Sequence, residues 1–200
     1  MSMNILVAGA TGKTGQQLVQ NLIDQGHKPT ALVRESSDTS ALPQGVDLRH
    51  GNLADLQTGV CDGMEAVIFA AGSGGSTGPE MTEKVDRDGA KRLIDLAKES
   101  AVKRFVMLSS IGADQANPTG DIAPYLNAKH EADEYLKASG LTYSILRPVA
   151  LTNDGRGEDV ILGEDVDKSA KASRADVAHV LAEAATTGRY DGMAQNMQSA

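Results

Sequence analysis

The chain has 200 residues, which suits a single domain of ordinary size. Its 27 acidic and 19 basic residues give a formal net charge of -8, which excludes an extended nucleic-acid surface because such a surface needs clustered Lys and Arg. The single cysteine excludes an internal disulfide, and no stretch has the pattern of a signal peptide or the length of a membrane span. We expect a cytoplasmic protein whose partner is a small molecule, and not nucleic acid or a membrane.

The start of the chain predicts a strand, a tight turn and a helix. An apolar run at residues 5–8 precedes the sequence GATGKTG, and apolar side chains recur at helical spacing over residues 16–23. In a dinucleotide-binding turn, one glycine permits the turn, one lets the backbone approach the diphosphate and one packs the helix against the strand. Here these positions are Gly9, Gly12 and Gly15.

The tripeptide Gly12-Lys13-Thr14 also suggests a different phosphate loop, that of the ATPases. That loop needs a glycine five residues before Gly12, where this chain has Val7. We therefore expect a dinucleotide whose diphosphate lies at the amino end of the first helix. The cofactor contacts expected from this turn are Gly9, Thr11, Gly12, Lys13, Thr14 and Gly15.

Short apolar runs alternate with helical stretches along the rest of the chain, which is typical of a parallel sheet with helices on both faces. Ser173 followed by Asp176 is a capping pattern that marks the start of the last helix. The remaining predicted strands are residues 29–33, 46–50, 66–70, 104–108 and 143–147, the other predicted helices are 81–100 and 124–138, and 153–159 is expected to be a loop.

Six strands in this order predict an α/β fold with one doubly wound parallel sheet, the Rossmann fold. We expect a single domain over residues 1–200, with the ligand at the carboxyl ends of the strands. Residues 150–200 are expected to form a short C-terminal extension on the substrate side, with a helix and a strand or two.

Arg34 decides which dinucleotide is expected. It ends the second predicted strand, where an arginine suits the extra phosphate of NADP and a carboxylate suits the ribose of NAD. Lys13 would add a second positive charge. Glu35 would favour NAD if the register moved by one residue, and Arg34 could instead be a solvated surface charge. NADP is the expected cofactor, and NAD is less favoured.

Two further loops are expected to contact the cofactor. Asn52 and Leu53 follow the third strand and are predicted to lie at the adenine edge, unless they are ordinary turn residues. Ala70, Ala71 and Gly72 follow the fourth strand, and their small size would let the cofactor ribose lie close to the backbone. A loop that merely leads into a helix would look the same.

A candidate catalytic set lies in the second half of the chain. Tyr125 and Lys129 are four residues apart on a predicted helix, so both project from one face. A neighbouring ammonium stabilises a phenolate and favours proton transfer near neutral pH, and this lysine could also hold the nicotinamide ribose. Ser110 follows the fifth strand and could bond to a substrate carbonyl or hydroxyl, although Ser109 and Ser110 could instead cap the next turn.

The four histidines do not predict a metal site. None of them pairs with cysteine or carboxylates at a spacing suited to metal ligands, so no metal is expected. We interpret them as structural or surface residues: His27, His50, His130 and His179.

Taken in order, these motifs resemble the short-chain dehydrogenases/reductases, in particular their small atypical members described as NAD-dependent epimerase/dehydratase-like or sugar epimerase-like. The resemblance covers nearly the whole chain. It implies that Tyr125 is the acid/base, that Lys129 is its partner and a ribose ligand, that Ser110 orients the substrate, and that Pro148 and Val149 lie beside the nicotinamide. The motifs are Gly9/Gly12/Gly15, Leu32-Val33-Arg34, Asn52-Leu53, Ala70-Ala71-Gly72, residues 85–90, Ser109-Ser110, Tyr125 with Lys129, and Leu146-Arg147-Pro148.

The chain departs from the wider family at Asp86. Members of the wider family have an asparagine there that supports the lysine, whereas the atypical subgroup resembles this chain in having an aspartate. A carboxylate would pair with Lys129 and offset part of its effect on Tyr125. Asp86 could also be only a polar residue on an early helical turn. Asn52 stands where members often have Asp, which leaves adenine contacts possible.

We therefore predict an NADP-dependent oxidoreductase that moves hydride between nicotinamide and a small carbonyl, quinone or flavin-like substrate, with Tyr125 giving or taking the proton. The short extension after the sixth strand disfavours the sugar-nucleotide pocket of the full epimerases. Two alternatives remain: a non-catalytic NADP-binding module that senses the redox state, and a sugar epimerase/dehydratase.

Overall fold

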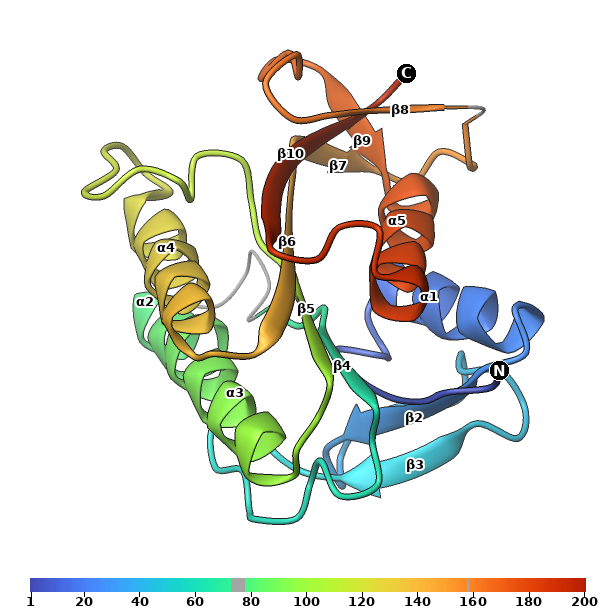
Figure 1. Cartoon of the computed structure of the whole chain (residues 1–200). Helices are drawn as coiled ribbons and strands as arrows, with labels where there is room; N and C mark the ends of the chain where they lie inside the picture. Colours follow the sequence, from blue (N-terminus) through green and yellow to red (C-terminus); the bar gives the residue numbers. More distant parts are fainter. Residues whose placement is uncertain (73–77, 158) are drawn as a thin grey trace.

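The computed structural model describes residues 1–72, 78–157 and 159–200 (Figure 1). Its centre is an eight-stranded sheet with the order β3-β2-β1-β4-β5-β6-β10-β8. Neighbouring strands are parallel, except that β8 runs antiparallel to β10. The strands are β1 (Asn4–Ala8), β2 (Lys28–Val33), β3 (Asp47–His50), β4 (Ala66–Phe69), β5 (Arg104–Leu108), β6 (Thr142–Pro148), β8 (Val160–Leu162) and β10 (Met193–Ser199). The predicted α/β doubly wound sheet is confirmed.

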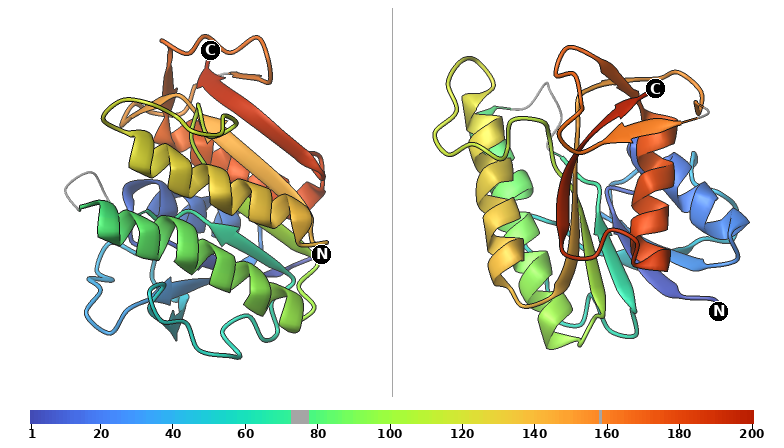
Figure 2. Two further views of the ribbon diagram at one scale, coloured as in Figure 1. Left: turned by 90° about the vertical axis from the view of Figure 1, so that its left-hand side faces the viewer. Right: turned by 45° about the horizontal axis from the view of Figure 1, so that its top comes forward.

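Helices cover both faces of this sheet (Figure 2). Helices α1 (Lys13–Asp24) and α5 (Arg174–Thr187) lie together on one face, and α3 (Ala90–Glu99) and α4 (Ala123–Ala138) lie on the other. Each face has its own apolar core, because the inner strands are buried on both sides. The core has few aromatic side chains and is built mainly from Ala, Val, Leu and Ile.

The glycine turn after β1 fixes where α1 begins. Gly9 has a φ of 82°, and a Cβ there would lie 2.6 Å from the backbone of Ala70 and Ala71. Only glycine suits this position, because the conformation is left-handed and the neighbouring backbone is close. The end of β1 can therefore approach the end of β4, where the cleft described below is formed.

The structure does not have the single regular helix predicted over 81–100. This part of the chain forms three consecutive segments, which are α2 (Pro79–Thr82), a π-helical segment η1 (Glu83–Gly89) and α3. A Cβ at Gly89 would lie 2.7 Å from the carbonyl oxygen of Leu53, so η1 packs closely on the loop after β3. Insertion of π turns is common near functional sites, and this one contains the buried Asp86.

The C-terminal extension has more strands than expected. Besides α5, it contributes β8 and β10 to the main sheet, and β7 (Ala150–Thr152) pairs with β9 (Lys171–Ser173) in a separate small sheet. The predicted cap is present, because the backbone N–H of Asp176 donates to Oγ of Ser173 at 3.0 Å. Within the described ranges, no helix is both long and apolar enough to cross a bilayer.

Candidate cofactor and substrate cleft

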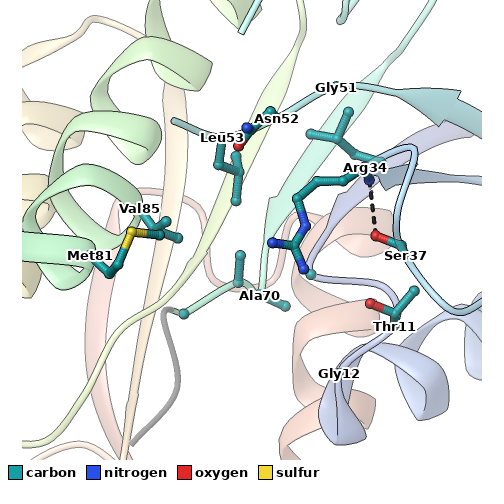
Figure 3. Close-up of a pocket in the computed structure, with 14 residues that line it drawn as sticks. Thr11, Gly12, Arg34, Ser37, Gly51, Asn52, Leu53, Ala70, Met81 and Val85 are labelled. Carbon is teal, nitrogen blue, oxygen red and sulfur yellow. Dashed lines mark hydrogen bonds between the residues drawn. The ribbon is translucent and has the colours of Figure 1, made fainter. Parts of the chain in front are cut away.

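Two adjoining cavities open at the carboxyl ends of the central strands. The first has a volume of about 400 Å³ and is lined by the loops after β1, β2, β3 and β4 (Figure 3). The second has a volume of about 690 Å³ and reaches the amino ends of α1, α4 and α5. The two cavities share Gly12, Ala70, Ala71 and Gly72, so together they form one cleft across the sheet edge.

The glycine turn lies at the centre of this cleft. Gly12 is the residue before α1, and no side chain of the described residues caps the first turn. The N–H groups at the start of α1 therefore face the cleft without a side-chain partner, as an anion-binding helix end requires. Gly15, in the first turn of α1, packs closely on the glycine turn, because a Cβ there would collide with the carbonyl oxygen of Gly9. The turn fits a dinucleotide diphosphate at Gly12, with close helix–strand packing at Gly15.

Arg34 lines the first cavity, and Figure 3 shows its side chain extending toward Ala70 and Thr11. Its backbone N–H donates to Oγ of Ser37 at 3.0 Å, which brings a hydroxyl to the same wall. Glu35 does not line this cavity, and its carboxylate lies 3.4 Å from Nδ1 of His50. The register therefore presents a guanidinium to the cleft, and not the neighbouring carboxylate.

Asn52 and Leu53 line the far side of the first cavity, opposite Ala70 (Figure 3). Oδ1 of Asn52 accepts a hydrogen bond from the N–H of Ala54 at 3.0 Å, so this side chain also shapes its own turn. The position of Asn52 is thus compatible both with contact to the adenine and with an ordinary role in the turn. Ala71 and Gly72 lie between the cavities, where their small size keeps the cleft continuous.

Tyr125 and Lys129 line the second cavity from α4. Nζ of Lys129 lies 5.7 Å from the centre of the Tyr125 ring, so the two residues share one face of the helix as expected. Tyr125 is half-buried at the cavity wall, whereas Lys129 is only 2% exposed. The phenol is accessible to a bound molecule, and the ammonium lies deeper.

The Lys129 ammonium is surrounded by acceptors. Nζ lies 3.0 Å from Oδ1 of Asp86 and donates to the carbonyl oxygens of Ala71 and Leu108, each at 3.4 Å. Burial by itself lowers the pKa of Lys129, but Tyr125 and nearby carboxylates, Asp86 foremost, outweigh it and raise that pKa. An ammonium has three protons, and these three acceptors match that number. Lys129 thus joins α4 to η1 and to the ends of β4 and β5.

The two serines after β5 have different surroundings. Ser109 lines the second cavity, and its Oγ donates to Oδ2 of Asp133 at 2.8 Å. Oδ2 of Asp133 also accepts a hydrogen bond from Nε of Arg147 at 3.0 Å. Burial raises the pKa of Asp133, although Arg147, Ser109 and Lys129 oppose that rise. Ser110 is half-buried, its Oγ donates to the carbonyl of Ile111 at 3.3 Å, and it is absent from the cavity wall formed by the described residues.

The glycine turn and the cleft have the geometry of a dinucleotide-binding site, and a comparison with family models agrees. The model for NAD(P)H-binding proteins matches residues 9–187. The chain belongs to the NAD(P)H-binding family. Its described residues contain no cluster of three or more His, Cys, Asp or Glu that could hold a metal ion.

Relatives of this NAD(P)H-binding protein have been given related descriptions. An uncharacterised sugar epimerase of Bacillus subtilis (strain 168), YhfK, is 38% identical over 185 residues, covering 90% of this chain and 86% of the relative. A solved structure from Bacillus halodurans, provisionally assigned as an NAD-dependent epimerase/dehydratase, has a TM-score of 0.91 and 34% identity, covering 100% of this chain and 95% of that one. The oxidoreductase ylbE of Lactococcus lactis has a TM-score of 0.85 and 30% identity, covering 99% and 91%.

Pro148 and Val149, expected beside the nicotinamide of an NAD(P)H-binding protein, are buried at the end of β6 and are absent from the described walls of both cavities. The N–H of Val149 donates to the carbonyl of Met197 at 3.0 Å. Leu151, two residues further on, lines the second cavity in their place, together with Arg174 from α5. Sequence patterns did not single out Leu151, Arg174 or Ser37, because each reaches the cleft through tertiary packing and none belongs to a motif.

Proposed function

We propose that this protein is an NADP-dependent reductase of a compact carbonyl, quinone or flavin-like substrate, with Tyr125 as its acid/base. The observation that carries the proposal is the continuity of the cleft. Arg34 lines one end, Tyr125 lines the other, and the glycine turn lies between them. A dinucleotide with its adenosine in the first cavity and its diphosphate at α1 would bring the nicotinamide into the second.

The preference for NADP is supported by Arg34 and Ser37. A guanidinium donates in a fork that matches phosphate oxygens, and a serine hydroxyl can add one more donor. The exposed guanidinium has no ion-pair partner among the described residues. An extra phosphate on the adenosine ribose would supply that partner.

When bound, the nicotinamide supplies the hydride. The role proposed for Tyr125 is to donate its phenolic proton to the substrate oxygen as hydride reaches the neighbouring carbon, and to take that proton back in the reverse direction. Lys129, held by Asp86, would position this end of α4 and the loop of Ala71. The small residues at Ala71 and Gly72 would leave room for the ribose.

The second cavity favours a compact, largely apolar substrate. Its wall includes Leu108, Ile122, Pro124 and Leu151 near Tyr125. A volume of about 690 Å³ must also hold the nicotinamide and its ribose, so the space for substrate is limited. Planar aldehydes, quinones and flavins meet both conditions.

A second candidate function is a non-catalytic NADP-binding module that senses redox state. The contacts of Lys129 favour it. Three acceptors already surround the ammonium, one of them the carboxylate of Asp86, so less of its charge is available to a phenolate or a ribose. A sugar epimerase/dehydratase, the third alternative, is supported only by the descriptions of relatives.

A substrate screen separates these functions. Purified protein is mixed with NADPH and a panel of aldehydes, quinones and flavins, and the nicotinamide absorbance is followed. Substrate-dependent loss of NADPH is expected for the reductase. NADPH binding without any such loss across the panel would reject the reductase in favour of the sensing module.

A further inference from the structure

Arg174 lies in the wall of the second cavity but has no role in the function described so far. It is the first residue of α5 and lies in the same wall as Leu151 and Tyr125. Its Nη1 donates to Oδ1 of Asn153 at 2.8 Å. Within residues 1–72, 78–157 and 159–200, it forms no ion pair.

The charges around the second cavity do not cancel. Lys129 is paired with Asp86, so neither contributes a net charge to the wall. Among the described residues, the other charged members of the wall are Lys13, Arg174 and Asp121, two cations against one carboxylate. This local excess of positive charge occurs in a chain with a formal net charge of -8. Cavities of one sign concentrate ligands of the opposite sign.

Lys13 and Arg174 come from different elements. Lys13 is the first residue of α1, next to the expected diphosphate, whereas Arg174 comes from the C-terminal extension beside Leu151. Among the residues that the structure describes, the hydrogen bond to Asn153 restrains the guanidinium through one nitrogen. The other donors of its fork remain for a ligand, and a restrained fork loses less conformational entropy on binding.

We propose that Arg174 is an oxyanion-binding residue of the cleft. This inference rests on the proposed function only in assuming that the cleft binds a dinucleotide and a small organic molecule. Two molecules can supply this oxyanion. One is the substrate, through a carboxylate, sulfonate or phosphate, and the other is the cofactor, through its diphosphate. With the apolar wall formed by Ile122, Pro124 and Leu151, the first source describes an amphipathic substrate that has an apolar body and one anionic group.

Binding measurements test this proposal without turnover. The probes are 2-naphthoate and 2-naphthamide, which have the same shape and differ in charge, titrated by calorimetry into NADP⁺-saturated protein. The affinity for NADP⁺ is measured separately, on cofactor-free samples of the same proteins. The variant Arg174→Gln keeps a polar side chain and removes the charge, and Arg174→Lys restores a cation. Arg156→Gln is the matched control, because Arg156 lines a separate cavity beside His179.

We expect wild type to prefer naphthoate and Arg174→Gln to bind it about tenfold more weakly, with naphthamide unchanged, because charge-assisted hydrogen bonds are the strong ones. A similar loss in NADP⁺ affinity, with the probe ratio unchanged, assigns the oxyanion to the diphosphate. If Arg174→Gln alters neither the probe ratio nor the NADP⁺ affinity, the proposal is overturned. The reductase proposal fails separately, through the absence of turnover in protein that still binds NADP⁺ and probe.

Discussion

Nζ of Lys129 lies 3.0 Å from Oδ1 of Asp86, and the two side chains are 3% and 0% exposed. The pair links α4 to the π-helical segment η1 at the second cavity, whose wall includes Lys129. Ion pairs this deeply buried cost desolvation energy, and they persist only when both partners are present. Removal of one partner should therefore lower the free energy of unfolding by more than the loss of an ion pair at the surface does.

A double-mutant cycle should reveal this coupling. Asp86→Asn should lower the free energy of unfolding by about 3 kcal/mol, because it leaves the Lys129 ammonium without a counter-charge. Lys129→Met should cost a similar amount, and the double variant should cost at least about 1 kcal/mol less than the sum. Urea denaturation gives all three values. Glu131→Gln is the control, since it breaks the exposed pair with Lys91 and should cost less than about 1 kcal/mol. Additive costs would mean that the buried pair is not coupled.

The proton-transfer role predicts that Tyr125→Phe abolishes turnover and retains NADPH binding. Phenylalanine fills the same space at the cavity wall but has no proton to give. NADPH consumption with an active substrate measures the first effect, and the quenching of cofactor fluorescence measures the second. Tyr135→Phe is the control on the same helix, because that hydroxyl donates to Asp95 outside the cleft. Undiminished turnover in Tyr125→Phe would assign the proton to another donor.

Much of this fold follows from local patterns in the sequence. The positions of the strands along the chain and the glycine turn were predictable, because apolar runs and the spacing of Gly9, Gly12 and Gly15 reflect constraints within a few residues. The π-helical segment was not, since the apolar spacing over 81–100 suits an ordinary helix equally well. The family resemblance implies that its Asp86 pairs with Lys129, 43 residues later, and the structure shows this contact, which no local pattern predicts.

Part of the candidate site was also predictable from the sequence. Residues at the ends of strands, such as Arg34 and Asn52, could be placed in the cleft because parallel strands end at one edge of a sheet. The sequence did not show whether Ser109 or Ser110 lines the cavity, because side-chain directions reverse at each residue of an extended chain. Arg174 also escaped prediction, since its position depends on how α5 packs beside α1.

Arg34→Glu should weaken NADPH binding by roughly 10–100-fold and leave NADH binding nearly unchanged, because charge-assisted hydrogen bonds to a phosphate are lost and repulsion is added. Dissociation constants for both cofactors, measured side by side, give the ratio that matters. Glu35→Gln is the neighbouring control, and it should leave that ratio as in wild type because Glu35 lies outside the first cavity. A ratio insensitive to Arg34→Glu would remove the case for NADP.

The glycines of the turn should separate stability from cofactor binding. Gly15→Ala should destabilise the fold by about 2 kcal/mol or more, because the new methyl group collides with Gly9 and lies 2.8 Å from Cα of Ala10. Gly12→Ala meets Gly9 only at 3.3 Å, so its effect on unfolding should be smaller. It should still weaken NADPH binding, since it adds bulk where the diphosphate approaches the backbone. Equal losses of stability in the two variants would contradict these separate roles.

Cys61 provides a test of core packing away from the cleft. Its thiol is 0% exposed, and burial raises its pKa from an ordinary 9.0 to about 12. Because the thiolate is the reactive form, a disulfide reagent at pH 8 should label native protein very slowly and urea-unfolded protein rapidly. Rapid labelling of the native state would mean that this side of the sheet opens readily.

The same thiol predicts how stability changes at alkaline pH. The unfolded thiol loses its proton near pH 9.0, whereas the folded thiol keeps it to about 12, so the unfolded state binds fewer protons between these values. Stability is then expected to fall as pH rises through this window, by up to about 1.4 kcal/mol per pH unit from this group alone. Cys61→Ala has a constant cavity cost and no thiol to titrate, so the difference in free energy of unfolding between wild type and Cys61→Ala should shrink above pH 9. A difference that stays constant with pH would show that the folded thiol ionises as readily as the unfolded one.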